Sequence, residues 1–165
     1  YALIVHFVPY VTSLGHSGTL AAGALGLVGG ASIPARFGAG FASDYVGRKP
    51  ILVASMLLMA GSLFGIVLLE GTLALVALVL AFGVGFGGQN GLYSPLVADV
   101  FAVSNVGRMI GLTSVAFAIS GAAGPVVSSL LFDATGAYVV PFAVAGILAV
   151  VGAALLSLSR PTASG

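Results

Sequence analysis

The sequence predicts an all-α, polytopic membrane protein that forms a bundle of six transmembrane helices. Hydrophobic residues make up 59% of its 165 residues and charged residues only 5%, and the mean hydropathy is +1.22. A soluble domain of this length carries roughly a quarter charged residues. The apolar residues also form long continuous runs without a period of two, which argues against membrane-spanning strands. The lipid bilayer is therefore the expected partner of most of the surface.

Polar or turn-forming breaks divide the chain into five runs of the length that a transmembrane helix needs, about 20 residues, and a shorter opening run. The expected helices are residues 1–12, 19–41, 50–69, 72–94, 108–132 and 139–158. The first run is too short to cross a bilayer alone, and residue 1 is Tyr rather than Met. We therefore expect residues 1–165 to form one domain of a longer protein, with the first helix truncated.

The charges are distributed unequally among the breaks. When successive breaks are assigned to alternate faces, one face receives four basic residues and the other receives no lysine or arginine. The two sets are Arg48, Lys49, Arg108 and Arg160 on the first face, and Glu70, Asp133 and His16 on the second. Positively charged connections stay in the cytoplasm. The chain is thus predicted to be a multi-pass protein of the cell (plasma) membrane, with residues 42–49, 95–107 and the C-terminus cytoplasmic.

Composition also excludes several classes of function. A net charge of +1 without a long basic cluster gives no electrostatic basis for binding nucleic acid. The absence of cysteine excludes disulfides and thiolate metal sites. No paired carboxylates, metal-ligand cluster or nucleophile with its base lies at a matching depth in the membrane. We therefore expect no enzyme activity and no metal or organic cofactor.

Glycine recurs at helical spacing among the 25 glycines of the chain, as at Gly26 and Gly30 and at Gly83 and Gly87. The hydrophobic effect does not drive helices together in lipid, so association depends on small residues that let backbones approach closely. Gly83, Gly87, Asn90 and Ser94 fall within about 60° of one another on a helix. A second stripe contains Thr113, Phe117, Gly121, Gly124 and Ser128. These helices are expected to pack against other helices.

Residues 40–50 read Gly-Phe-Ala-Ser-Asp-Tyr-Val-Gly-Arg-Lys-Pro. This segment resembles the G-x-x-x-D-[RY]-x-G-[RK]-[RK] signature of the major facilitator superfamily, which lies between its second and third helices and, usually degraded, between its eighth and ninth. The matching positions are Gly40, Asp44, Gly47, Arg48 and Lys49. The glycines suit a tight connection, and Asp44 with Arg48 supplies a charge pair that could latch one conformational state.

Further stretches resemble the monocarboxylate transporter and oxalate/formate antiporter branch of that superfamily. They are residues 85–91 continuing through 98–99 to 107–108, then 121–125 and 132–138, with 6–10 at the start. The resemblance implies helices 7–12 of a twelve-helix fold, whose partner is the N-terminal six-helix half of the same transporter. It also implies a secondary active symporter or antiporter that moves a small organic anion, a monocarboxylate, by alternating access.

Arg36 lies inside an apolar helix, about five residues or roughly 8 Å from the expected cytoplasmic end. A guanidinium at this depth is costly unless it pairs, faces water or snorkels. In the branch named above, an arginine at the matching place in the eighth helix is implicated in holding the substrate carboxylate. The resemblance therefore implies that Arg36 is the substrate's countercharge. The structural alternative is an arginine that snorkels to the cytoplasmic surface.

The chain departs from the branch in two ways. Some dicarboxylate-specific members carry a lysine in the eleventh helix, whereas no charge lies between Arg108 and Asp133 here. A single buried cation balances one carboxylate better than two, which favours a monocarboxylate over oxalate. Some carriers also place an aspartate one turn before the arginine, where this chain has Ser32. Proton coupling through such a pair is therefore not predicted.

Four other residues are candidates for lining the substrate site: His6, Tyr10, Asn90 and Phe117. Histidine is the side chain best suited to gain or lose a proton under physiological conditions, so His6 could relay a coupled proton or donate to the substrate. The structural alternative is a histidine that is hydrogen-bonded to a neighbouring helix. Asn90 could likewise tie helices together, which is the commoner role of a polar residue in a transmembrane helix.

Asp44, Arg48, Asp99 and Arg108 all lie at the expected cytoplasmic face, where we interpret them as a latch between the two central loops. The alternative is that they are solvated determinants of topology. For the whole protein, the alternatives to an anion carrier are a drug or sugar carrier of the same superfamily and a non-transporting membrane sensor with the same fold.

Overall fold

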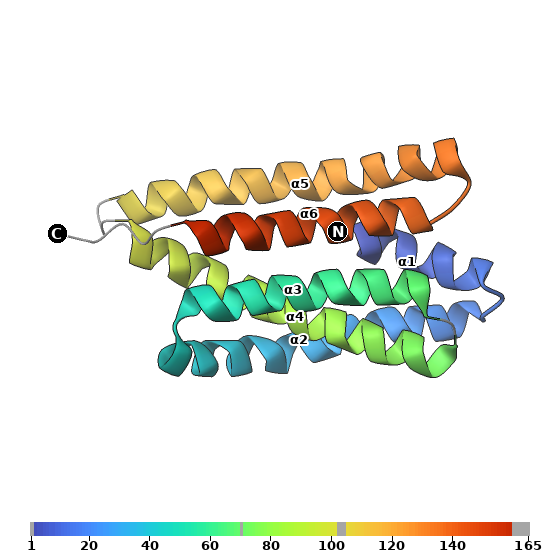
Figure 1. Cartoon of the computed structure of the whole chain (residues 1–165), viewed down its shortest axis with the longest axis horizontal. Coiled ribbons are helices and arrows are strands. Elements are labelled where there is room, and N and C mark those ends of the chain that lie inside the picture. The colour runs from blue at the N-terminus through green and yellow to red at the C-terminus, as the bar shows by residue number, and fades with distance from the viewer. Residues whose placement is uncertain (1, 70, 102–104, 160–165) are drawn as a thin grey trace.

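The computed structural model describes residues 2–69, 71–101 and 105–159, and within these ranges the chain forms six helices and no strand. The helices are α1 (Ala2–Ser13), α2 (Gly18–Val46), α3 (Arg48–Leu68), α4 (Thr72–Val100), α5 (Val106–Thr135) and α6 (Val139–Leu158). They run along one common direction, with short connections alternating between the two ends of the bundle (Figure 1). The all-α prediction is confirmed.

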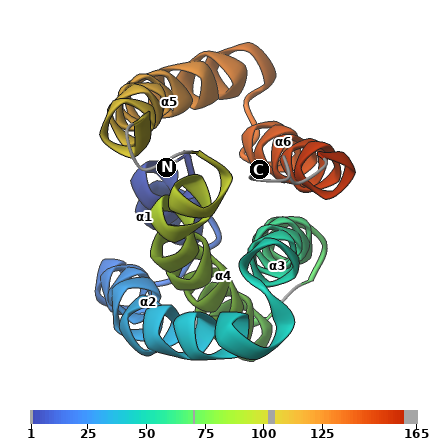
Figure 2. The same cartoon turned by 90° about the vertical axis from the view of Figure 1, so that its left-hand side faces the viewer.

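Three helices form the tightest part of the bundle. α4 lies between α2 and α3 and packs against both, and α6 packs on α3 (Figure 2). α5 lies at the opposite side of the bundle, against α6 and α1. A buried core joins α1 to the central helices, through residues that include Phe7, Val79, Phe82 and Phe142. Among the described residues of α5, only Ser128 is buried.

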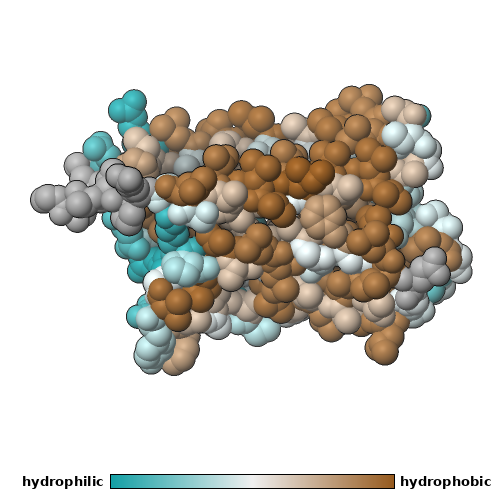
Figure 3. Space-filling view, in the orientation of Figure 1, coloured by the Kyte–Doolittle hydropathy of each residue, from teal (hydrophilic) through white to brown (hydrophobic). Residues whose placement is uncertain are grey.

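Five of the helices, α2 to α6, are long and apolar enough to cross a membrane, and α1 is a shorter apolar helix. Large apolar side chains cover the outside of the bundle as well as its core, with Leu73, Ile119, Leu148 and Leu155 all exposed. Apolar surface extends over the middle of the molecule, and hydrophilic residues gather at one end (Figure 3). This is the distribution expected of a multi-pass membrane protein, whose outer surface contacts lipid.

The polar end of the bundle contains the α2–α3 junction, the α4–α5 connection and the end of α6. Arg48, Lys49 and Arg108 all lie in these segments, at the first residues of α3 and α5. Asp133 lies near the opposite end, in the last turn of α5. The charge asymmetry expected from the sequence is therefore present among the described residues. Glu70 and Arg160, which also entered that prediction, lie outside them.

The predicted helix boundaries were wrong at this end. α2 continues to Val46 and α4 continues through Pro95 to Val100, so the expected loop 42–49 is reduced to Gly47 and the loop 95–107 begins only after α4. Hydropathy marks where a helix leaves lipid, whereas the helix itself ends only where the backbone geometry changes. Arg36 consequently lies about ten residues, or about 15 Å, before the end of α2, twice the distance from the helix end that the sequence predicted.

Gly47 makes the sharp junction between α2 and α3. Its φ of 95° and ψ of 152° belong to a region that is open essentially only to glycine. The Gly47 amide donates to the Ser43 carbonyl at 2.9 Å and ends α2, while the next residue begins α3. The second glycine of the 40–50 segment is thus required by the backbone conformation.

We predict that Gly47→Ala lowers the stability of the full-length protein by about 1–3 kcal/mol, because an L-residue is strained at this φ. A steric clash does not contribute to this loss of stability, since the nearest atom to the added Cβ would be Pro50 Cδ at 3.7 Å. The measurement is the thermal unfolding midpoint of the purified protein in detergent. Gly61→Ala is the matched control, because Gly61 is helical and its Cβ would meet nothing within 4 Å. Equal midpoints for the two variants would contradict the prediction.

Candidate functional site

Arg36 lies on α2 with its side chain exposed, and its backbone contacts α4 at Gly91. Within the described residues, no carboxylate pairs with the guanidinium and no hydrogen bond satisfies it. A charged group inside an apolar transmembrane helix needs water, a partner or a ligand. Arg36 is therefore a cation that is available to a group outside this part of the chain.

A pocket of about 220 Å³ lies between α4 and α5, and its lining residue Asn90 directly precedes Gly91, which lies against Arg36. Its lining is formed by Asn90, Tyr93, Ser94, Ile110, Thr113, Ser114 and Phe117. Asn90 and Phe117, two of the residues proposed from the sequence, are thus brought together. The Asn90 side-chain amide donates to the Phe86 carbonyl at 2.8 Å, one turn earlier on α4. Hydroxyls and an amide give this pocket polar walls without a charge.

Sequence reasoning missed Tyr93, which links this pocket to a second one of about 440 Å³ between α3, α4, α5 and α6. Asn90, Tyr93 and Phe117 line both pockets. The Tyr93 and Phe117 rings meet edge to face, with centroids 5.1 Å apart. The available signal was helical spacing, because a residue three positions after Asn90 projects from the same face.

His6 and Tyr10 both make bonds between helices. His6 Nε2 lies 3.1 Å from the Pro125 carbonyl oxygen of α5, which accepts when this nitrogen carries the proton. The Tyr10 side chain is only 8% exposed, and its hydroxyl donates to the Ile66 carbonyl of α3 at 2.8 Å. For His6 this matches the alternative given by the sequence analysis, a histidine that is hydrogen-bonded to a neighbouring helix. Neither residue lines the two pockets between α4 and α5.

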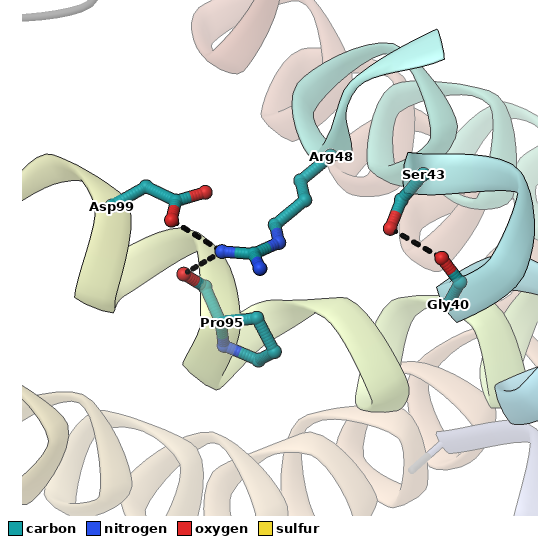
Figure 4. Close-up of polar contacts among 5 residues, drawn as sticks. All are labelled: Gly40, Ser43, Arg48, Pro95 and Asp99. Carbon is teal, nitrogen blue, oxygen red and sulfur yellow. Dashed lines mark hydrogen bonds and ion pairs between the residues drawn. The ribbon is translucent and has the colours of Figure 1, made fainter. Parts of the chain in front are cut away.

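At the polar end, Arg48 joins the start of α3 to the last turns of α4 (Figure 4). Its Nη1 donates to Asp99 Oδ1 and, at 3.0 Å, to the Pro95 carbonyl. The final carbonyls of a helix carry partial negative charge, so a guanidinium is favourable there. The ion pair is partly exposed, with 34% of the Arg48 side chain and 53% of the Asp99 side chain accessible. Its net contribution to stability is therefore under about 1 kcal/mol.

Lys49 performs the equivalent role for α6. Its Nζ donates to the Ser157 carbonyl at 3.0 Å and to the Ser159 carbonyl. These contacts satisfy carbonyls that have no partner within the last turn of α6. Two successive basic residues at the start of α3 therefore hold the ends of two other helices, α4 and α6.

The other members of the predicted latch are arranged differently from the expectation. Asp44 is exposed and makes no ion pair among the described residues, because Arg48 turns toward α4 instead. The expected Asp44–Arg48 pair is thus replaced by Arg48–Asp99. Gly40 accepts a 2.7 Å hydrogen bond from the Ser43 hydroxyl within α2. Arg108 is exposed at the start of α5 and has no ion-pair partner within the described ranges.

Comparison with known proteins identifies the family. The sequence model of the family described as "Major Facilitator Superfamily" matches residues 1–165. The chain is 28% identical over 157 residues to monocarboxylate transporter 13 of Bos taurus, covering 92% of this chain and 36% of that protein. It is 29% identical over 154 residues to MFS transporter asaE of Aspergillus flavus, covering 92% of this chain and 35% of that protein.

The chain thus spans about a third of the length of these relatives. With the family match over its whole length and the lipid-facing helical bundle, the chain belongs to the Major Facilitator Superfamily.

Proposed function

We propose that this chain is the C-terminal six-helix half of a secondary transporter that carries a small organic anion, a monocarboxylate, by alternating access. Transporters of this kind place the substrate near the bilayer midplane, between two bundles that rock against each other. The N-terminal half of the same protein would supply the second bundle. The protein acts as a carrier rather than as an enzyme, and the substrate leaves it chemically unchanged.

Arg36 is the observation that carries this proposal. Its side chain is exposed, it has no carboxylate partner in the described chain, and it lies about 15 Å inside a transmembrane helix. Exposure on the surface of an isolated half is compatible with a central cavity that the other half closes. A guanidinium presents two parallel N–H donors to a carboxylate, which explains the choice of arginine over lysine.

The charge balance supports a monocarboxylate. α5 carries no charged residue between Arg108 and Asp133, and the pocket between α4 and α5 is lined by uncharged groups. One cation facing the cavity neutralises one carboxylate, whereas a dicarboxylate would keep an unpaired negative charge in a medium of low dielectric. The relative in Bos taurus is named as a monocarboxylate transporter, which agrees with this substrate class.

The pocket between α4 and α5 would hold the remainder of the anion. Asn90 and Phe117 line it together with Tyr93, so an amide, a ring face and a phenol surround one space. His6 lies on α1 and is bonded to Pro125 of α5. We include His6 as the group that could exchange a coupled proton, because Ser32 occupies the position where some carriers have an aspartate.

The orientation follows from the positive-inside rule. Arg48, Lys49 and Arg108 lie at one end of the bundle, which we place in the cytoplasm of a cell with this protein in its plasma membrane. Arg48 and Asp99 then form a latch at the cytoplasmic surface. Their pairing would favour the outward-open state and would be released when the two halves rock.

A neutral solute, such as a sugar or a drug, is the second candidate, because no charged residue lines the pocket between α4 and α5. Arg36 would then serve only to anchor α2 near the cytoplasmic surface. The two candidates differ in one measurable property, the dependence of transport on the Arg36 charge.

We predict that Arg36→Ala lowers uptake of labelled lactate or pyruvate by the full-length transporter about 10- to 100-fold. This loss corresponds to about 1.5–3 kcal/mol, the net worth of one hydrogen bond to a charged group. Arg36→Lys should keep partial activity, because it retains the charge but not the two-pronged geometry. Formate and oxalate, tested in parallel, establish whether one or two carboxylates are accepted.

Arg160→Ala is the matched control, since it removes the same side chain from the segment after α6. Uptake is normalised to the amount of protein at the cell surface. If an anion is transported and Arg36→Ala transports it as fast as the parent, Arg36 is not the anchor. Uptake of a neutral sugar or drug with no anion transport would favour the second candidate.

We also predict that Asp99→Asn lowers the maximal transport rate about two- to fivefold with little change in KM. The partly exposed pair is worth under about 1 kcal/mol, so only the balance between conformations should shift. Arg48→Asp combined with Asp99→Arg should recover part of the rate, because the charge pair is re-formed. An unchanged rate in Asp99→Asn would show that these charges only set the topology.

A further inference from the structure

α4 packs between α2 and α3, and glycines lie on both of the faces through which it contacts them. Gly83, Gly87 and Gly91 contact α2, and Gly85 and Gly88 contact α3. A Cβ added at Gly83 would lie 2.8 Å from the Val28 carbonyl oxygen, and one at Gly87 would lie 2.7 Å from Ser32 Cα. Both distances are shorter than van der Waals contact, so α2 and α4 touch through their backbones. We call this contact the α2–α4 seam.

Arg36 lies at the cytoplasmic end of the α2–α4 seam. A Cβ added at Gly91 would lie 3.3 Å from Arg36 Cα, 3.4 Å from Arg36 Cβ and 3.4 Å from the Arg36 carbonyl oxygen. The Arg36 side chain therefore leaves α2 directly beside Gly91. These distances require a displacement of a few tenths of an ångström, which a transmembrane helix pair accommodates without unfolding.

Close packing against α3 opposes a movement of α4 away from α2. On the side of α4 that faces away from the α2–α4 seam, a Cβ at Gly85 would already lie 2.7 Å from the Ser55 carbonyl oxygen and 2.7 Å from Met59 Cγ. At Gly88, the Ser55 hydroxyl occupies the same kind of position. Since α3 already packs closely against α4, we expect a side chain at Gly91 to displace the backbone of α2 at Arg36.

We propose that Gly91 is a positioning residue for Arg36: the missing side chain at Gly91 lets α2 approach α4 and thereby sets the place of the guanidinium that binds the anion. This inference rests on the proposed function, in which Arg36 holds the substrate carboxylate. Gly91 itself does not touch the substrate. Its effect is transmitted through the Arg36 backbone, so it should act on substrate affinity and not on the rate of conformational change.

The test compares transport kinetics of the full-length protein and its variants in proteoliposomes. Gly91→Ala should raise the KM for the transported monocarboxylate about three- to tenfold with little change in maximal rate, because small misplacements of a binding group weaken a two-pronged contact. In an Arg36→Lys background the same substitution should change KM less than twofold, because a flexible ammonium tolerates displacement.

Two variants control for simple disruption of packing. Gly83→Ala lies on the same seam, two turns away from Arg36, and should lower the thermal midpoint while leaving KM within about twofold of the parent. Gly61→Ala, where the added Cβ meets nothing within 4 Å, should change neither. Ser55→Ala removes the hydroxyl beside Gly88, so its combination with Gly91→Ala should recover part of the KM.

The outcomes separate this inference from the proposed function. A parental KM in Gly91→Ala, or an equal rise in the parental and Arg36→Lys backgrounds, would overturn the positioning role even if Arg36→Ala abolishes transport. Normal anion transport by Arg36→Ala would instead overturn the proposed anchor. If Gly91→Ala does not reach the membrane, the Ser55→Ala combination is compared with Ser55→Ala alone, and a KM no higher than that of Ser55→Ala counts against the inference.

Discussion

The contact on which the rest of this structure depends is the close approach of α2 to α4 through glycine. In lipid, apolar side chains gain little by leaving the bilayer, so helices associate through short-range packing between backbones. Gly83, Gly87 and Gly91 provide this contact on one side of α4, and Gly85 and Gly88 provide it on the other. The three helices α2, α3 and α4 therefore form a closely packed unit, with Arg36 at its edge.

The charged residues act at the margins of this unit. Arg48 and Lys49 occupy the first residues of α3, and each donates to carbonyls near the end of a different helix, α4 or α6. Helix ends attract positive charge because their last carbonyls lack partners. The same residues contribute to the charge asymmetry of the bundle, so one pair of side chains both connects helix ends and concentrates positive charge at one end of the bundle. Arg36 is different, because no group of the described chain neutralises it.

Much of the fold could be predicted from composition and hydropathy, because helices surrounded by lipid must be apolar over most of their length. The number of helices and their order followed from the apolar runs, and the segment 40–50 indicated the superfamily before any tertiary contact was known. The ends of α2 and α4 could not be predicted in this way. Ala42, Ser43 and Asp44 are polar or small enough to lie outside lipid, yet their backbone remains helical until the positive φ of Gly47. Hydropathy therefore underestimated the length of α2 after Arg36.

Residue type and order alone were enough to predict the solvent, the helical class, the family and Arg36 as a cation within an apolar helix. The contact partners of these residues followed from the three-dimensional arrangement of the helices. It paired Arg48 with Asp99 in place of Asp44, bonded His6 and Tyr10 to neighbouring helices, and brought Tyr93 to Phe117. It also placed Gly91 against Arg36. Such partners depend on how helices that are distant in sequence are rotated and spaced, and hydropathy does not encode either quantity.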